Sequence, residues 1–174
     1  MKTLFIIIIA ILLIVALFLL SNSNEKYTTV DKKQYTNSIR NDFLKYMEEV
    51  AEKPPQKWEK DVTICVKTFN RPSCLFRLIK SIRDLYTTVK IIIVDDSKFP
   101  ILETGIYRTG IEVVVLPQYV GVSGRNEGLF KTTTKYFVLV DDDMYLIPQT
   151  DLWKMWNFLD RKSTRLNSSH QIIS

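Results

Sequence analysis

The sequence has few cysteines, a single histidine and no dense cluster of basic residues. Although the formal net charge is +5 and the pI is near 9.1, no four consecutive residues are basic. Basic and aromatic residues also do not interleave along one face, as expected of a nucleic-acid-binding surface. We therefore expect no nucleic-acid partner. We interpret the Lys and Arg residues as a solvated surface that also suits an anionic substrate.

The two cysteines, Cys65 and Cys74, are close together in the sequence. They could pair if the domain lies in an oxidising compartment. However, Cys65 falls inside a predicted strand and Cys74 in the first turn of a predicted helix. We therefore expect both to be buried free thiols, which behave as small apolar side chains.

The longest apolar run covers residues 4–20 and follows a short tail of residues 1–3. A helix of this length spans roughly 26 Å, close to the ~27 Å of an endoplasmic reticulum bilayer. We expect an uncleaved signal anchor in an early secretory or Golgi membrane, with the rest of the chain in the lumen. A cleaved signal peptide is the alternative, because the small residues Ser21, Asn22 and Ser23 would suit cleavage.

Residues 21–60 are polar and rich in lysine, which predicts a stem between the anchor and the folded domain. Apolar residues at helical spacing, followed by Pro54, indicate one amphipathic helix within it. These apolar residues are Tyr35, Ile39, Phe43, Tyr46, Met47 and Val50. The helix could serve as a spacer or as a weak self-association helix, and the sequence favours neither.

Strand and helix patterns alternate from Asp61 onward. Short β-branched and aromatic runs predict strands at residues 62–66, 89–94, 111–116 and 136–140. Helices are predicted from Pro72 to Leu85 and from Asp151 to Asp160, and a glycine-flanked turn at residues 121–126 is predicted to open a helix that runs to about Thr133. This alternation predicts an α/β fold with a parallel, doubly wound sheet. The unbroken apolar run at 136–140 favours a strand that is buried on both faces.

Three consecutive carboxylates, Asp141, Asp142 and Asp143, directly follow the last predicted strand. Adjacent carboxylates repel one another and resist desolvation, so such a cluster is stable when it is solvated or when a cation binds to it. A divalent metal that carries a phosphate ester is the obvious candidate. A plain solvated acidic turn is the alternative.

Polar segments also follow the other predicted strands or open the next helix, at residues 68–70, 95–97 and 121–126. Ligands of doubly wound sheets bind outside the carboxyl ends of the strands. Because parallel pairing places those ends on one edge, we expect these segments and the three carboxylates to form a single site.

The segments V-T-I-C-V-K-T-F-N-R, I-I-I-V-D-D-S, G-V-S-G-R-N-E-G-L and Y-F-V-L-V-D-D-D together resemble nucleotide-sugar glycosyltransferases of the GT-A fold, with D-D-D at the D-x-D position. A second, more specific set of motifs is similar to the animal β1,4-N-acetylgalactosaminyltransferases. These motifs are K-T-F-x-R, S-I-R, V-D-D-S, G-R-N and T-T-K-Y-F-V-L-V-D-D-D. The resemblance covers about residues 61–159. It implies a Rossmann-like donor-binding half-domain, UDP-N-acetylgalactosamine as the UDP-sugar donor, a glycan or glycolipid acceptor, Mn²⁺ as cofactor, inversion at the anomeric carbon and a Golgi type II topology.

The resemblance also implies roles at the nucleoside end of the donor. Thr68 and Phe69 would border the uracil. Asp96, with Asp95 as the alternative, would accept a hydrogen bond from the base or its ribose, and Asp142 would hold the ribose. Phe69 could instead be a plain core residue.

At the other end of the donor, the resemblance implies that Arg125 faces the diphosphate and that Asp143 coordinates the metal. Asp141 would support the metal from the first or second shell of ligands. A departing UDP carries charge that a metal and a cation stabilise in a dry cleft. Arg125 could instead form a surface ion pair.

The C-terminal end of the sequence departs from the family pattern. Residues 162–174 show no periodicity and resemble adapter-derived tails of translated sequence assemblies, so we expect an artefact there and assign no role to His170 or to the sequon at Asn167. The donor-binding domain is then expected at residues 61–161. An inverting transferase also needs a general base, which we expect in a C-terminal portion beyond this sequence. The chain alone is therefore predicted to bind donor, to be inactive and to leave residues 136–140 partly uncovered.

Two other functions fit parts of the pattern. A metal-dependent phosphatase of the haloacid-dehalogenase type also places D-x-D after a strand, but it needs a Thr or Val four positions after its nucleophile, where this chain has Tyr145. A membrane-anchored protein that binds nucleotide sugars without transferring them is the stronger alternative.

Overall fold

The computed structural model describes residues 31–50, 54 and 56–170, with side chains described as far as residue 162. The chain divides into two compact units, residues 1–38 and 39–174. The predicted anchor at residues 4–20 lies outside the described residues. Within the described part of the chain, no helix combines the length and the apolar character needed to cross a membrane.

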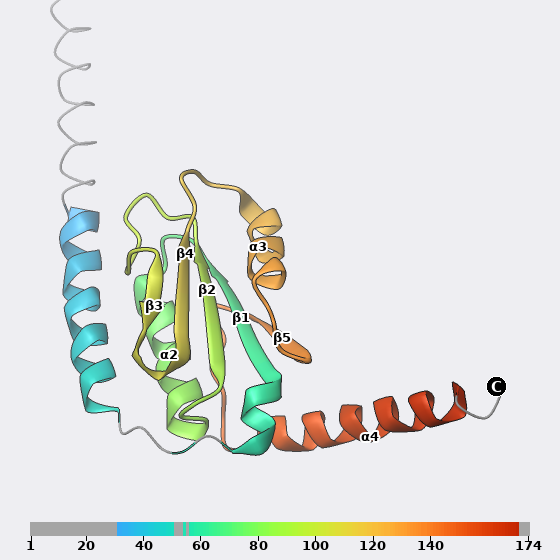
Figure 1. Cartoon of the computed structure of the whole chain (residues 1–174). Helices are drawn as coiled ribbons and strands as arrows, with labels where there is room; N and C mark the ends of the chain where they lie inside the picture. The colour runs from blue at the N-terminus through green and yellow to red at the C-terminus, as the bar shows by residue number, and fades with distance from the viewer. Residues whose placement is uncertain (1–30, 51–53, 55, 171–174) are drawn as a thin grey trace, which may run out of the picture. The chain divides into compact units, whose positions relative to one another are not determined.

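The second unit is built on a five-stranded sheet with the strand order β3-β4-β2-β1-β5 (Figure 1). Its strands are β1 (Val62–Thr68), β2 (Lys90–Asp95), β3 (Gly105–Tyr107), β4 (Ile111–Val115) and β5 (Tyr136–Asp141). The neighbours β4, β2, β1 and β5 run parallel, as predicted. The sequence patterns do not predict β3, which pairs antiparallel with β4. The sheet is therefore mixed rather than wholly parallel.

Each face of the sheet packs against its own helix. Alternate residues of a strand point to opposite faces. Ile64 of β1 belongs to the larger core, to which α2 (Pro72–Leu85) contributes. Cys65, the next residue, belongs to a second core that Leu129 of α3 (Gly124–Phe130) packs against. Figure 1 shows α2 behind the strands. This two-sided covering is the α/β arrangement that the sequence predicts.

The strand β5 forms one edge of the sheet and is covered unevenly. Phe137 and Leu139 are 52% and 46% exposed, whereas Val138 packs against the larger core. The prediction that this strand is buried on both faces is therefore wrong. The prediction that it is partly uncovered is confirmed, because an edge strand with one covered face exposes alternate side chains.

An amphipathic helix precedes the sheet, as predicted. In the first unit, residues 31–38 are helical, and helical backbone also covers residues 39–49 of the second unit. The ring of Phe43 is buried and meets Phe76 of α2 edge-on, with 5.5 Å between ring centroids. Met47 is also buried in this core. The predicted stem therefore contributes side chains to the core of the second unit.

Arg83, near the end of α2, connects three segments at the amino ends of the parallel strands. Its guanidinium donates hydrogen bonds to the main-chain oxygens of Tyr86, Val89 and Thr109, at 3.1, 2.9 and 2.7 Å. Burial lowers the pKa of Arg83 to about 10, which leaves the guanidinium charged at neutral pH. These bonds join the end of α2 to the start of β2 and to the turn before β4.

Two predicted helix ends are wrong. The glycine-flanked turn predicted at residues 121–126 begins as the 3-10 turn η3 (Gly121–Ser123), as expected, but the following α3 ends at Phe130 and not near Thr133. The last helix, α4 (Leu152–His170), continues past Asp160, where the sequence predicts its end.

Both cysteines are free thiols, as predicted. Cys65 is buried, and burial raises the pKa of its thiol. Cys74 lies in the first turn of α2, as expected, but it is only partly buried.

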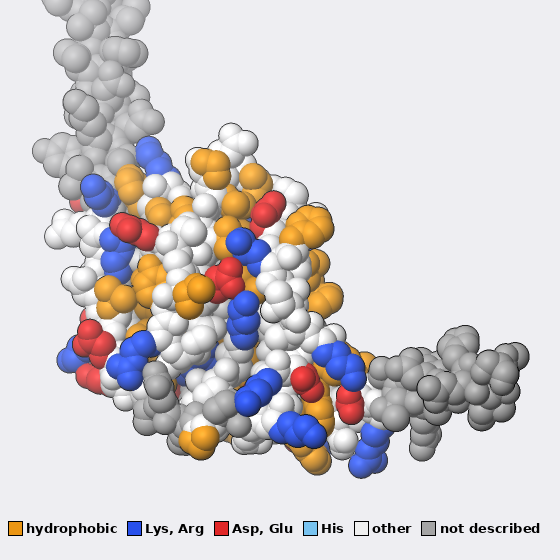
Figure 2. Space-filling model, viewed as in Figure 1, with side chains coloured by type: hydrophobic (Ala, Val, Ile, Leu, Met, Phe, Trp, Pro, Cys, Tyr) orange, Lys and Arg blue, Asp and Glu red, His pale blue; other side chains and the backbone are white. Residues whose placement is uncertain are grey.

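The surface of the described residues mixes side chains of both signs. On the face drawn in Figure 2, acidic and basic side chains are interspersed with apolar ones. This distribution is typical of a solvated surface.

Candidate functional site

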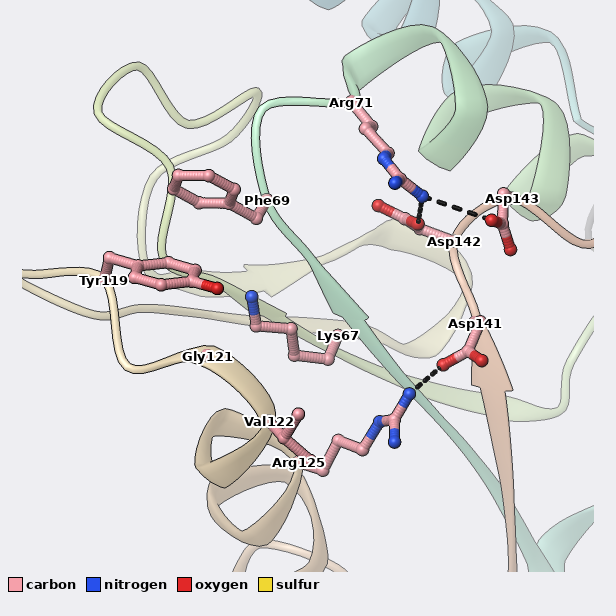
Figure 3. A pocket seen from close by; sticks show the side chains of 10 residues that line it. All are labelled: Lys67, Phe69, Arg71, Tyr119, Gly121, Val122, Arg125, Asp141, Asp142 and Asp143. Atoms are coloured by element: carbon pink, nitrogen blue, oxygen red, sulfur yellow. Dashed lines mark hydrogen bonds and ion pairs between the residues drawn. The ribbon is translucent and has the colours of Figure 1, made fainter.

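A cleft of about 320 Å³ lies at the carboxyl ends of β1 and β5, beside the start of α3 (Figure 3). Three segments supply its walls: the end of β1, the loop that leads into α3, and the turn after β5. The lining residues are Lys67, Phe69, Arg71, Tyr119, Gly121, Val122, Arg125, Asp141, Asp142 and Asp143. The cleft is therefore on the edge of the sheet where ligands of doubly wound folds bind.

The three carboxylates differ in how firmly they are held. Asp142 is buried, and its Oδ2 accepts a hydrogen bond of 2.7 Å from the Thr68 hydroxyl of β1. The side chains of Asp141 and Asp143 are 48% and 57% exposed. The turn itself is closed by Met144 N, which donates to the main-chain oxygen of Asp141 at 3.1 Å. Asp142 is thus fixed to the sheet, and its two neighbours face the cleft more freely.

Two arginines pair with these carboxylates from opposite sides (Figure 3). Arg71 places Nη1 at 3.3 Å from Oδ1 of Asp142 and at 3.1 Å from Oδ2 of Asp143. Arg125 of α3 forms an ion pair with Asp141. The charges of Asp142 and Asp143 raise the pKa of Arg71. The acidic turn is therefore balanced by guanidinium groups from two different elements.

Lys67 and Asp96 form an ion pair below the aromatic wall of the cleft. Lys67 Nζ lies 2.6 Å from Oδ1 of Asp96, whose side chain is 0% exposed. The other carboxylate oxygen of Asp96 accepts the main-chain N–H of Val120 at 2.9 Å. The same ammonium lies 5.3 Å from the ring centroids of both Phe69 and Tyr119. Asp96 therefore holds a cation beside the adjacent rings of Phe69 and Tyr119, where a cation–π attraction adds to the ion pair.

Gly124, the first residue of α3, allows this helix to approach Lys67 closely. A β-carbon at Gly124 would lie 3.2 Å from Val120 Cγ2 and 3.3 Å from Lys67 Cε. A larger residue would therefore require the side chains of Val120 and Lys67 to shift by a few tenths of an ångström. The G-R-N segment of the sequence thus has a packing reason for its glycine.

Asp95 has a different environment from Asp96. It is buried, and its carboxylate accepts main-chain N–H groups of Ser97 at 2.9 Å and of Ile101 at 3.3 Å. Burial raises the pKa of Asp95, although these hydrogen bonds act in the opposite direction. Asp95 does not line the cleft. Its carboxylate organises its own loop.

The turn between β1 and α2 positions Arg71. Asn70 has a positive φ of 54°, and its N–H donates to the Ser97 hydroxyl at 2.6 Å. Arg71 is the N-cap residue of α2, and Pro72 is the first helical residue, as predicted. A left-handed residue directly before the helix turns the chain sharply. The turn thereby places the Arg71 side chain over the acidic residues.

The structure brings most of the predicted site residues together. Phe69, Arg125 and the three carboxylates line the cleft, as the strand-end argument expects. Thr68 and Asp96 lie beside the cleft. Thr68 donates a hydrogen bond to Asp142, and Asp96 accepts one from Lys67, and both of these partners line the cleft. The ligand-binding roles of all these residues stay predictions.

Sequence reasoning missed three lining residues: Lys67, Arg71 and Tyr119. Lys67 and Arg71 both stand inside the quoted motif K-T-F-x-R, which is the signal that could have found them. Tyr119 lies in an irregular loop after Pro117, where the sequence has no periodicity to indicate a direction. Its ring packs at a tilt against the ring of Phe69, with 4.4 Å between the two ring centroids, and both rings line the cleft.

The residues of the cleft do not fit a metal ion enclosed by protein ligands, but they fit one that is held by carboxylates and substrate phosphates together. In the described part of the chain, no three or more His, Cys, Asp or Glu side chains are grouped so as to hold a metal ion. An ion enclosed by protein ligands therefore does not fit. Small divalent ions are commonly held by one or two carboxylates together with substrate phosphates. Asp143 and Asp141, which line the cleft, fit that second arrangement.

Comparison with known proteins places these features in a family. The model of "Glycosyl transferase family 2" matches residues 63–168. Human β-1,4 N-acetylgalactosaminyltransferase 1 is 41% identical over 101 residues, which are 58% of this chain and 18% of the human protein. Mouse β-1,4 N-acetylgalactosaminyltransferase 2 is 36% identical over 109 residues, which are 62% of this chain and 21% of the mouse protein.

The chain thus matches about a fifth of the length of these relatives. Among solved structures, TarS from S. aureus is similar with a TM-score of 0.49 and 25% identity, over 58% of this chain and 32% of that chain. The family model covers more than half of the chain. The chain therefore belongs to glycosyl transferase family 2.

Proposed function

We propose that the chain carries the donor site of a glycosyltransferase. Residues 61–161 bind a UDP-sugar, and the sugar, N-acetylgalactosamine, is transferred with inversion to a glycan or glycolipid acceptor. Membership of glycosyl transferase family 2 supports sugar transfer. The names of two relatives, both N-acetylgalactosaminyltransferases, support the choice of donor sugar.

One observation carries the proposal: three carboxylates and two arginines face each other in a single cleft (Figure 3). A nucleoside diphosphate needs cations at its phosphates, and a metal bridging those phosphates needs carboxylates. Asp141 and Asp143 can supply the carboxylates, and Arg125 can supply the cation. A site for a neutral ligand would need neither group.

We assign the nucleoside to the aromatic side of the cleft. Phe69 and Tyr119 offer ring faces on which a uracil can stack. Thr68 borders this region, and Asp96 accepts from the base or its ribose. The Asp142 carboxylate, held in place by Thr68, is assigned to the ribose hydroxyls. Asp95, the alternative to Asp96, has less support because its carboxylate bonds only to its own loop, whereas Asp96 pairs with Lys67, which lines the cleft.

We assign the diphosphate to the arginine side. Asp143, supported by Asp141, would hold Mn²⁺ against the phosphates. The bound ion would supply Lewis-acid stabilisation of the charge on the departing UDP. Arg125 would stabilise the same charge directly, because a guanidinium can bind two phosphate oxygens at once.

The cellular location is proposed from the sequence. Residues 4–20, with their uninterrupted apolar character, would anchor the chain in the Golgi membrane, and residues 21–60 would form the stem. The folded unit would then lie in the lumen.

The proposal is tested with the full chain in detergent micelles and Mn²⁺. Calorimetry measures the binding of UDP-N-acetylgalactosamine, UDP-galactose, UDP-N-acetylglucosamine and GDP-mannose. In parallel, UDP-N-acetylgalactosamine that carries a label in its sugar is offered with a panel of β-galactosides. We expect the first donor to bind best and Asp143→Asn to lose this binding. Asp151→Asn is the matched control, because Asp151 accepts the N–H of Lys154 at the start of α4, outside the cleft.

Each outcome bears on a different claim. Transfer of the label would establish the enzyme and contradict the predicted inactivity of the chain alone. Donor binding without transfer is the result predicted for the chain alone, and it fits both the donor site of a transferase and the alternative of a nucleotide-sugar-binding protein that does not catalyse transfer. If no UDP-sugar binds, the proposal falls, and a preference for GDP-mannose would remove the uracil assignment.

A further inference from the structure

Arg71 is a cation of the cleft to which neither the motifs nor the family comparison assigns a role. We propose that Arg71 is an exchangeable counterion: it occupies Asp142 and Asp143 in the free protein and moves to the diphosphate when a divalent metal binds the acidic turn. This inference rests on the proposed function and deepens it. It assigns a second phosphate-binding arginine opposite Arg125.

The ion pairs of Arg71 are weak ones. A single nitrogen, Nη1, serves both carboxylates, at 3.3 Å from Asp142 and 3.1 Å from Asp143. Strong charge-assisted hydrogen bonds are shorter, at about 2.7–2.9 Å, and arginine commonly makes two parallel ones to a carboxylate. The Arg71 side chain is also 55% exposed. Solvent and incoming ligands can therefore compete for it.

The backbone of Arg71 is fixed, so only its side chain needs to move. Leu75 N donates to the Arg71 main-chain oxygen at 3.0 Å, which holds the first turn of α2. On the other side, the N–H of Asn70 is bound to Ser97. A long, exposed side chain on a fixed backbone changes rotamer without disturbing the fold.

The carboxylates stay in place when Arg71 leaves. Asp142 keeps its hydrogen bond of 2.7 Å from Thr68. Asp143 remains next to it in the turn that Met144 N closes. A metal can therefore replace the guanidinium at Asp143 without rearrangement of the turn.

The charges of the cleft explain why the exchange must involve both ligands. Three cations line it, Lys67, Arg71 and Arg125, and so do three carboxylates. A metal that arrives alone displaces a guanidinium, which then lacks an anionic partner. UDP that arrives alone meets unneutralised carboxylates. When both bind, the metal takes the carboxylates and the arginines take the phosphates, so each ligand increases affinity for the other.

Arg77 provides a matched control on the same helix. Its Nη2 donates to the main-chain oxygen of Asp143 at 3.2 Å, and its guanidinium lies 5.7 Å from the ring centroid of Tyr145. It does not line the cleft. Removing its charge changes the net charge of the region as much as removing that of Arg71, but it removes no carboxylate pairing.

The experiment uses the full chain, Arg71→Gln and Arg77→Gln. Electron paramagnetic resonance of free Mn²⁺ measures metal affinity without nucleotide, and calorimetry measures UDP affinity at saturating Mn²⁺. For Arg71→Gln we expect Mn²⁺ alone to bind severalfold more tightly, because its competitor is gone. UDP with Mn²⁺ should bind roughly tenfold more weakly, as expected for the loss of one charge-assisted contact.

Opposite changes in the two affinities are specific to an exchangeable counterion. Unchanged or weaker Mn²⁺ binding in Arg71→Gln would overturn the inference, and so would UDP affinity equal to that of the wild type. Equal effects in Arg77→Gln would reduce the result to net charge and also overturn it. If the wild-type chain fails to bind UDP with Mn²⁺, the proposed function falls instead, which is a separate result.

Discussion

The helix α2 carries an arginine near each end, and the two have opposite environments. Arg83 is 1% exposed and donates to main-chain oxygens of three segments. The Arg71 side chain is 55% exposed and pairs with carboxylates of the cleft. Arg83 lies at the amino ends of the parallel strands, and Arg71 at the carboxyl ends.

The contrast shows how one residue type stabilises a fold in one place and serves binding in another. The bond from Arg83 to the Val89 oxygen is buried, and solvent cannot replace a donor that is lost there, so this arginine stabilises the fold. The exposed side chains of Arg71 and Asp143 exchange partners at little cost, because solvent already competes for their ion pair. The hydrogen bonds of Arg83 therefore stabilise the amino end of the sheet. The ion pairs of Arg71, at the carboxyl end, can be exchanged when a ligand binds.

Replacing the buried Arg83 has the largest expected effect on stability. Arg83→Leu leaves three main-chain oxygens without their donor, so we expect the free energy of unfolding to fall by about 3 kcal/mol. Urea unfolding followed by circular dichroism measures it. Arg71→Gln is the matched exposed change and should leave the unfolding midpoint unchanged. If Arg83→Leu is as stable as Arg71→Gln, burial is not what separates the two arginines.

Arg125 sharpens the binding side of the comparison. It pairs with Asp141 in the cleft, and we assign it to the diphosphate. Arg125→Gln should weaken UDP binding by roughly tenfold while uridine binding changes less than about twofold, because uridine has no phosphate to lose a contact. Calorimetry with both ligands at saturating Mn²⁺ measures the ratio. Equal losses for UDP and uridine would place Arg125 outside the phosphate site.

Much of the carboxyl end could be predicted from sequence, because it follows from parallel pairing. Apolar runs that end in polar residues locate β1, β2 and β5, and the geometry of the sheet then gathers those ends. The run at 136–140 also shows the limit of this reasoning. Its composition suits a central strand, yet it is an edge, because no property of the run itself specifies its neighbours.

The missed residues share a different cause. Lys67 lies in the observed strand β1, one residue beyond the strand predicted at 62–66, and only the long reach of its side chain brings the ammonium to the cleft. Arg71 precedes Pro72, and the positive φ of Asn70 directs its side chain toward the acidic turn. The spacing of apolar residues in the sequence does not predict such a local conformation. The strand β3 (Gly105–Tyr107) is too short to produce an alternating pattern.

Asp95 offers a smaller test, at the same edge as the cleft. Burial raises the pKa of its carboxyl above the value in the unfolded chain. A raised acid pKa contributes stability that is complete below the unfolded pKa, about 3.9, and is lost as the pH rises through the folded pKa. The wild-type free energy of unfolding, minus that of Asp95→Asn, should therefore fall as the pH rises above about 4. Urea unfolding at a series of pH values measures this difference, and a rise would show that Asp95 is stabilised as the anion.

The most direct test of the account is the metal dependence of UDP binding by the wild-type chain. UDP is titrated calorimetrically into the full chain with Mn²⁺ and again with a chelator. Since the cleft already pairs its carboxylates with arginines, the diphosphate can use those arginines only when a metal takes the carboxylates. The account predicts tight binding with Mn²⁺ and at least roughly tenfold weaker binding without it. Equal UDP affinity in the presence and absence of the metal would contradict it.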